Sequence, residues 1–183
     1  MPYIENSETI TGYRVKMMYK PAFRVTGFTL IVPPQKVSLV PEFWSTLIAD
    51  GRLEQLRESS SIRPWVLGLG SWDPECQKHG SRYTICLEET AYTDFSGLAQ
   101  QYTLFTKQIG ESDWMCFELD AQAAYEKFWQ DNPYKMMGPL GYDFHTGSFD
   151  VGLHFDAYPP TYQPEANPAF EFWITVKKRL KAG

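Results

Sequence analysis

Residues 167–176 read NPAFEFWITV, an apolar strand pattern with one carboxylate inside it. Side chains along a strand alternate between its two faces, which here separates an apolar face from a mixed one. The apolar face carries Phe170, Phe172, Ile174 and Val176, and the mixed face carries Glu171, Trp173 and Thr175. An acid in such surroundings is costly unless a partner neutralises it. We expect Glu171 to face either a ligand or a basic side chain from a neighbouring strand, such as Arg24 or Arg82.

The rest of the chain alternates between strand-like and helix-like segments. Runs rich in Val, Ile, Phe and Tyr, bounded by Gly, Pro or Asp, predict further strands. These lie at 13–19, 22–32, 65–71, 82–89, 102–108, 114–119 and 149–155. Apolar residues at helical spacing predict a helix that starts near Pro41 and stops at Gly51, and a second that follows Ala121 and closes at Pro133.

The two predicted helices suggest an internal duplication. Phe43-Trp44 in the first helix corresponds to Phe128-Trp129 in the second, and the two tryptophans are 85 positions apart (129 − 44). Coincidence is the alternative, because Phe-Trp pairs arise easily in a chain rich in aromatic residues. We expect a single domain over 1–183 with two strand-helix-strand-strand halves, at about 11–95 and 100–180. The predicted class is α+β, an antiparallel sheet with helices on one face and a concave ligand cleft on the other.

Composition narrows the class of partner. Hydrophobic residues make up 43% of the 183 positions, charged residues 21%, and aromatic residues 16%. Such an aromatic excess suits a ligand cavity as well as a core. The formal net charge is −5, whereas proteins that bind nucleic acid through its phosphates are basic. We expect no nucleic-acid partner for this chain alone.

Three cysteines, Cys76, Cys86 and Cys116, form no CxxC pair and leave an odd thiol. This pattern favours a reducing compartment, so we expect a cytoplasmic protein without disulfides. We expect no membrane segment, because neither a signal-peptide pattern nor a long apolar run occurs. The spacing of Cys76 and His79 alone is a poor metal signal. Glycine motifs for phosphate or dinucleotide binding are also missing, so we expect no metal and no cofactor.

Four segments give the chain a resemblance to the GyrI-like small-molecule-binding domain, which also forms the effector-binding part of some AraC-type and MerR-type regulators. They are residues 21–28 (PAFRVTGF), 41–44 (PEFW), 155–158 (FDAY) and 170–176 (FEFWITV). The family usually has Ile/Val-Pro in the closing strand, where this chain has Thr-Val, and a glutamate in place of Asp156. The resemblance covers nearly the whole chain.

The resemblance implies two sheet-and-helix modules with a hydrophobic, aromatic-lined pocket. In relatives a buried glutamate in the last strand contacts cationic lipophilic ligands, and Glu171 matches that position. Some stand-alone members look like hydrolases that open strained cyclopropane rings, using an acid and aromatic residues in the same pocket. Other members inhibit gyrase. The regulators add a helix-turn-helix domain, for which we expect no room in this chain.

Glu171 and Trp173 form the centre of the predicted site. A carboxylate beside an indole offers charge neutralisation and a cation–π surface, worth ~0.5 to 2 kcal/mol. In an apolar pocket the same carboxyl would also be competent as a general acid or base. Further aromatic side chains would form the walls, each with core packing as its alternative role. These candidates are Tyr13, Phe23, Trp72, Tyr83, Trp114 and Tyr142.

Three functions remain open from the sequence. The leading hypothesis is binding of amphipathic, cationic or aromatic small molecules in a pocket anchored by Glu171, as a drug or toxin binder without a DNA-binding domain. The second is hydrolysis of a strained electrophilic toxin in the same pocket, with Glu171 as the catalytic acid or base. The third is an interaction module that docks a protein partner, as gyrase-inhibiting members do.

Overall fold

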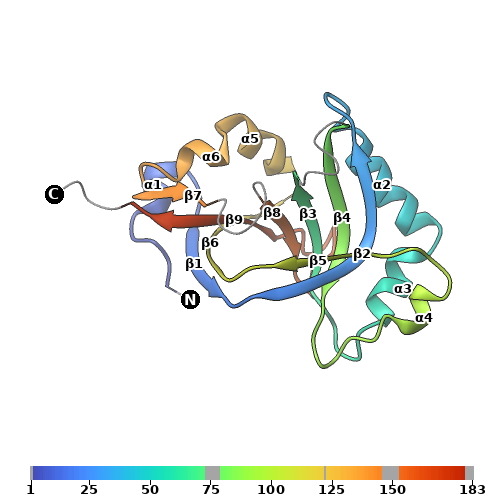
Figure 1. Ribbon diagram of the computed structural model, residues 1–183. Helices are drawn as coiled ribbons and strands as arrows, with labels where there is room; N and C mark the ends of the chain where they lie inside the picture. Colours follow the sequence, from blue (N-terminus) through green and yellow to red (C-terminus); the bar gives the residue numbers. More distant parts are fainter. Residues whose placement is uncertain (1, 73–78, 122, 146–152, 180–183) are drawn as a thin grey trace.

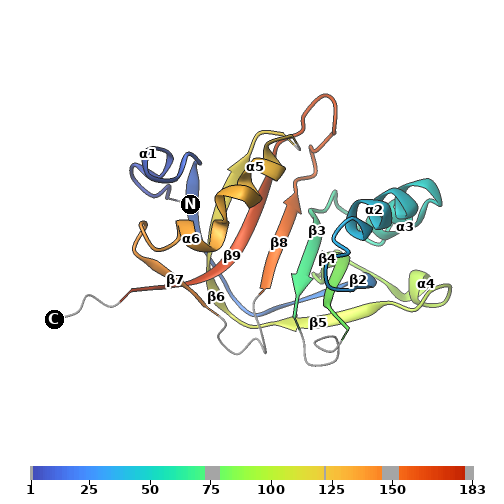
Figure 2. The same cartoon turned by 90° about the horizontal axis from the view of Figure 1, so that it is seen from above.

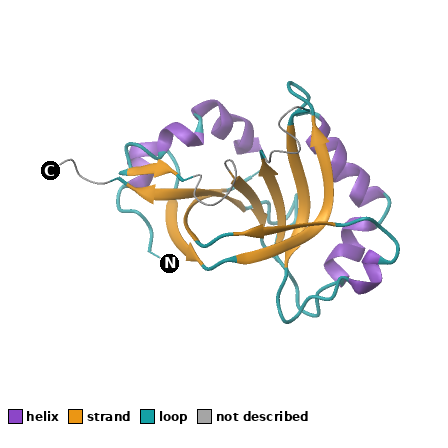
Figure 3. Ribbon diagram, in the orientation of Figure 1, coloured by secondary structure: helices purple, strands orange, loops and turns teal. Residues whose placement is uncertain are grey.

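The computed structural model describes residues 2–72, 79–121, 123–145 and 153–179 (Figure 1). Within these residues nine strands form one antiparallel sheet, and helices lie in the segments that connect the strands (Figure 3). The strands are β1 (Val15–Lys20), β2 (Phe23–Val32), β3 (Val66–Ser71), β4 (Ser81–Glu88), β5 (Phe105–Ile109), β6 (Ser112–Leu119), β7 (Tyr142–Phe144), β8 (Leu153–Tyr158) and β9 (Phe170–Lys178). The helices are α1 (Ser7–Thr11), α2 (Leu39–Ala49), α3 (Arg52–Glu58), α4 (Ser96–Ala99), α5 (Ala123–Asp131) and α6 (Pro133–Met136). The predicted α+β class is confirmed.

The strand order is symmetrical about its centre. It runs β1-β6-β9-β8-β3-β4-β2-β5, and β7 pairs with β9 beside this path. The consecutive strands β1 and β2 lie in opposite halves of the sheet, as do β5 and β6, so each of these segments crosses from one half to the other (Figure 1). At the centre, Asp156 of β8 lies opposite Gly68 of β3. This is the pseudo-two-fold arrangement that the repeated pattern predicts. The exact bounds of the two halves stay a prediction.

The longer helices pack on the sheet through the apolar stripes that their sequences predict. Leu47 of α2 and Leu56 of α3 lie in one buried cluster with Ile85 of β4. Phe128 of α5 lies in a second cluster with Phe172 of β9. Seen from above, α5 and α2 stand on either side of the central strands β8 and β3 (Figure 2). Each half of the sheet therefore has its own helix and its own core beneath it.

A third core fills the other face of the sheet. Side chains from every strand except β7 meet in one buried cluster, which includes Phe23, Leu69, Trp114, Phe155 and Trp173. Strands from both edges can contribute to one cluster only because the crossing segments curl the sheet around it. The concave face, where the sequence predicts the ligand cleft, is filled with side chains, and the cleft described below lies between the helices on the other face.

Several boundaries differ from the sequence predictions. The short elements α1, α4, α6 and β7 were not predicted, since so few residues carry no clear period. The strand expected at 149–155 is β8, which is described from Leu153 and continues to Tyr158; positions 149–152 and Cys76 lie outside the described residues. Gly51, with φ of +81°, separates α2 from α3 in the left-handed conformation that favours glycine.

None of the helices within the described residues combines the length and the apolarity needed to cross a membrane.

Candidate ligand-binding cleft

A large cleft separates α2 from α5, with strands β3, β4 and β8 as its floor. Its volume is about 1590 Å³, which exceeds the roughly 300–1000 Å³ of ordinary small-molecule sites. Many of the lining side chains are aromatic. They are Trp44, Trp72, Tyr83, Tyr125, Trp129, Tyr134, Tyr158 and Tyr162. Trp44 and Trp129, the pair related by the sequence repeat, stand on opposite walls.

Strand β8 supplies the polar part of the floor through simple alternation. His154, Asp156 and Tyr158 line the cleft, whereas Phe155 between them lies in the core of the concave face. The neighbouring strand β3 presents Gly68 at the position opposite Asp156.

The absence of a side chain at Gly68 shapes the floor. A Cβ atom there would lie 2.1 Å from the hydroxyl of Tyr83. Glycine is therefore required for the tyrosine to reach across β3 toward Asp156.

Asp156 is the polar centre of the cleft. Its side chain is 3% exposed and accepts hydrogen bonds from the hydroxyls of Tyr83, at 2.9 Å, and Tyr125, at 2.5 Å. Trp44 in turn donates its indole N–H to the Tyr83 hydroxyl at 3.1 Å. Burial raises the pKa of Asp156 to about 6, although both hydrogen bonds oppose the shift. At neutral pH it is an ionised acid that forms no ion pair with any of the described residues.

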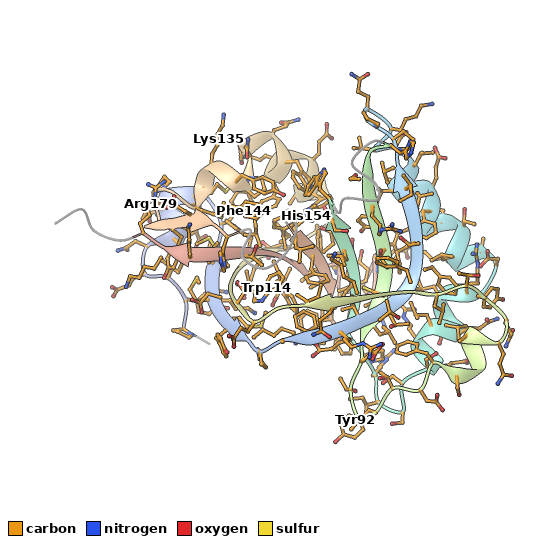
Figure 4. All side chains as sticks on the ribbon, in the orientation of Figure 1. Tyr92, Trp114, Lys135, Phe144, His154 and Arg179 are labelled. Carbon is orange, nitrogen blue, oxygen red and sulfur yellow. The ribbon has the colours of Figure 1, made fainter. Side chains whose placement is uncertain are left out.

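His154 adds no positive charge to balance that acid. Burial lowers the pKa of its imidazole to about 4, so the ring is neutral at neutral pH. The ring lies 5.5 Å from that of Trp129 and 5.8 Å from that of Trp72 between centroids, and Nδ1 is 3.4 Å from the Tyr134 hydroxyl. His154, labelled in Figure 4, therefore adds a neutral ring to the floor of the cleft beside these aromatic side chains.

The structure brings two of the predicted wall residues, Tyr83 and Trp72, into the cleft. Phe23, Trp114 and Trp173 instead belong to the core of the concave face (Trp114 is labelled in Figure 4). Tyr13 and Tyr142 pack at the margin of the cluster beneath α5. Most of the predicted aromatic residues therefore have the alternative role, core packing.

Glu171 lies outside the cleft, on the opposite face of β9 from Phe172. It forms an ion pair with Lys16 and accepts a hydrogen bond from the Trp173 indole at 2.6 Å. Burial disfavours the charge of Lys16, but the hydrogen bond and charge of Glu171 outweigh it and raise the pKa of the ammonium. Of the two interpretations of Glu171, the structure shows the basic partner, although Lys16 replaces the expected Arg24 or Arg82.

Sequence reasoning missed Asp156 as the central acid of the cleft, together with Tyr125 and Trp129. A signal was present in the segment LHFDAY at 153–158, where polar and apolar residues alternate strictly. An acid on the polar face of a central strand points into any space that the helices on that face leave between them. The apolar stripe of the helix after Ala121 indicated only a helix, and of its large rings only Phe128 is fully buried.

No family model matches the chain, and neither does any curated protein sequence. Solved structures do match it. SAV2435 bound to tetraphenylphosphonium is 14% identical, with a TM-score of 0.68 over 89% of this chain and 93% of that one. A putative transcription regulation protein from Staphylococcus aureus MU50 is 16% identical, with a TM-score of 0.62 over 90% and 97%.

A third match is EcmrR in a complex with DNA, which is 12% identical, with a TM-score of 0.52. It covers 96% of this chain but 61% of EcmrR. At these identities the likeness concerns the fold alone. The chain has the fold of the GyrI-like domain, which is the domain that its sequence resembles.

Proposed function

We propose that this protein binds amphipathic small-molecule cations in the cleft, with Asp156 as their counter-charge. The observation that carries the proposal is the placement of this acid, which is 3% exposed, lies among aromatic rings and forms no ion pair with any of the described residues. A buried carboxylate in that state is destabilised. A ligand that carries positive charge and excludes water would relieve it.

The walls of the cleft favour a cation whose charge is spread over an apolar body. Trp44 and Trp129 face the cleft from opposite sides, and indole rings attract cations by ~0.5 to 2 kcal/mol each. Asp156 already accepts a hydrogen bond on each oxygen, so a ligand need not donate one. SAV2435, which has the same fold and binds tetraphenylphosphonium, supports this choice of ligand class.

Isothermal titration with tetraphenylphosphonium tests the proposal and separates the two candidate acids. We expect wild type and Glu171→Gln to bind alike, because Glu171 lies outside the cleft, and Asp156→Asn to lose at least ten-fold in affinity. Equal binding by wild type and Asp156→Asn would refute the proposal. Loss of binding only in Glu171→Gln would restore the anchor that the sequence predicts.

The alternative functions are decided by the fate of the ligand. Mass spectrometry of a ligand after incubation with the protein should show an unchanged mass. Hydrolysis of a strained electrophile would instead change the mass of that compound. A protein partner, as in gyrase inhibition, stays a prediction.

The two described cysteines, Cys86 and Cys116, are buried and unpaired, which supports the cytoplasm as the compartment in which the protein acts.

A further inference from the structure

The two long walls of the cleft differ in chemistry. The wall on the side of α5 presents the rings of Tyr125, Trp129 and Tyr134, with the polar side chains of Glu126 and Gln130 between them. The wall on the side of α2 presents aliphatic side chains at positions 37, 40, 41 and 48, with Trp44 among them. These positions follow the spacing of one helix face, so they form a continuous stripe along α2 and the turn before it.

The aliphatic stripe is open to solvent. Val37 is 74% exposed and Ile48 is 62% exposed, although both line a concave surface rather than a convex one. Below them, Leu53 and Val66 are buried and line the same cleft. The charged residues of this wall, Arg57 and Glu54, pair with each other at 3.3 Å. This part of the wall therefore offers contact area to an apolar group and no unpaired charge.

The stripe is continuous with the acid through Trp44. The indole N–H of Trp44 reaches the Tyr83 hydroxyl at 3.1 Å, and that hydroxyl reaches Asp156 at 2.9 Å. Val40 and Pro41 lie one helical turn before Trp44, and Ile48 lies one turn after it. A group held at Asp156 can therefore extend an attached chain onto the aliphatic surface without leaving the cleft.

We infer that the α2 wall is a separate subsite that takes the alkyl tail of a cationic amphiphile whose head group lies at Asp156. The inference rests on the proposed function and deepens it by naming the ligand class, single-chain alkyl cations. It also accounts for a cleft volume of about 1590 Å³, larger than a compact cation needs. The aromatic wall takes the charged head, and the aliphatic wall takes the chain.

A homologous series of alkyltrimethylammonium ions, from butyl to dodecyl, tests the subsite. Titrations are run below the micelle concentration of each compound. In wild type we expect affinity to rise roughly four-fold per added methylene, the ratio that corresponds to about 0.8 kcal/mol for a buried methylene. The rise should stop once the chain has covered the stripe.

Single polar substitutions on the stripe provide the comparison. Ile48→Asn and Val37→Asn should reduce the gain per methylene for the longer compounds, with the smallest effect on the butyl compound. Both sites are more than half exposed, so the variants should fold, which circular dichroism verifies. Ile62→Asn is the matched control, because Ile62 is 51% exposed and is not among the lining residues.

Two results would overturn the subsite: affinity in wild type that does not depend on chain length, or a gain per methylene in Ile48→Asn and Val37→Asn that equals that of wild type. The proposed function is tested separately with tetraphenylphosphonium, which has no alkyl chain. If that compound needs Asp156 while the alkyl series is flat, only the subsite is refuted. If it binds Asp156→Asn as well as wild type, the proposed function fails.

Discussion

Replacing Asp156 with asparagine should stabilise the ligand-free protein at neutral pH while it weakens the proposed binding of cations. Burial raises the pKa of this acid from 3.8 to about 6. A shift of one unit corresponds to 1.36 kcal/mol between the two protonation states, so the ionised side chain lowers the free energy of unfolding by about 3 kcal/mol. An amide of nearly the same shape carries no charge and avoids this cost.

Part of the gain is lost in the hydrogen bonds. The carboxylate accepts from Tyr83 and Tyr125 at once, whereas an amide has one acceptor oxygen. The loss of the acceptor for one tyrosine hydroxyl lowers the free energy of unfolding by about 1 kcal/mol. The net gain is therefore about 2 kcal/mol, or roughly 4–8 °C in melting temperature for a chain of this size.

The pH dependence gives this prediction its sharpest form. Because the folded state binds the proton more tightly, the contribution of Asp156 to stability is complete below its unfolded pKa near 3.8 and is lost as the pH rises to about 6. At about pH 4 Asp156 is protonated, so the side chain at position 156 is neutral in wild type and in the variant. The variant should then be less stable than wild type by about 1 kcal/mol. Above about pH 7 the variant should be more stable. The difference therefore changes sign within this window.

Urea unfolding followed by circular dichroism, on both proteins across this pH range, measures that difference. Comparing the two proteins at each pH cancels the titration of every other group. A variant that is less stable than wild type at neutral pH would refute the reasoning, because the buried charge would then be stabilised by a partner. A difference that does not vary with pH would refute the raised pKa.

Two further predictions concern the same floor. The affinity for tetraphenylphosphonium, a permanent cation, should be constant above about pH 7 and fall about ten-fold per unit below about pH 6, where Asp156 is protonated; titration calorimetry that shows stronger binding in acid would contradict this. Gly68→Ala should weaken binding and cost about 1–3 kcal/mol in unfolding free energy, because its Cβ would lie 2.1 Å from the Tyr83 hydroxyl. Gly97→Ala is the control, since a Cβ there meets nothing within 4 Å, and it should stabilise by about 0.4–1 kcal/mol; equal effects of the two substitutions in urea unfolding would exclude the steric argument.

Local periodicity was enough to predict the main elements and which side chains share a face. The alternation at 170–176 is confirmed in β9: Phe172 lies in the cluster beneath α5, and Trp173 lies in the core on the opposite face. The repeat was informative as well. Trp44 and Trp129, matched by their offset in the sequence, stand on the two walls of one cleft.

Periodicity could not tell which face of the sheet is open. That depends on the segments β1–β2 and β5–β6, which cross between the halves and enclose the concave core. It also could not find the partner of Glu171. Lys16 is distant in sequence and comes near because β1 pairs with β6, which pairs with β9. Strand order is a property of the whole chain, and a local pattern does not contain it.

The two acids show how such a sequence can be interpreted when strand order is known. An acid in an apolar strand is a local conflict, and the fold either resolves it or leaves it in place. Glu171 is resolved by Lys16 and by the indole of Trp173, so a structural role is sufficient to explain it. Asp156 has two tyrosine hydroxyls and no counter-charge among the described residues, and its ionised form weakens the free protein. A residue that lowers stability and sits at the centre of an open cleft points to a function outside folding, and the proposed binding of a cation would remove the cost that folding leaves.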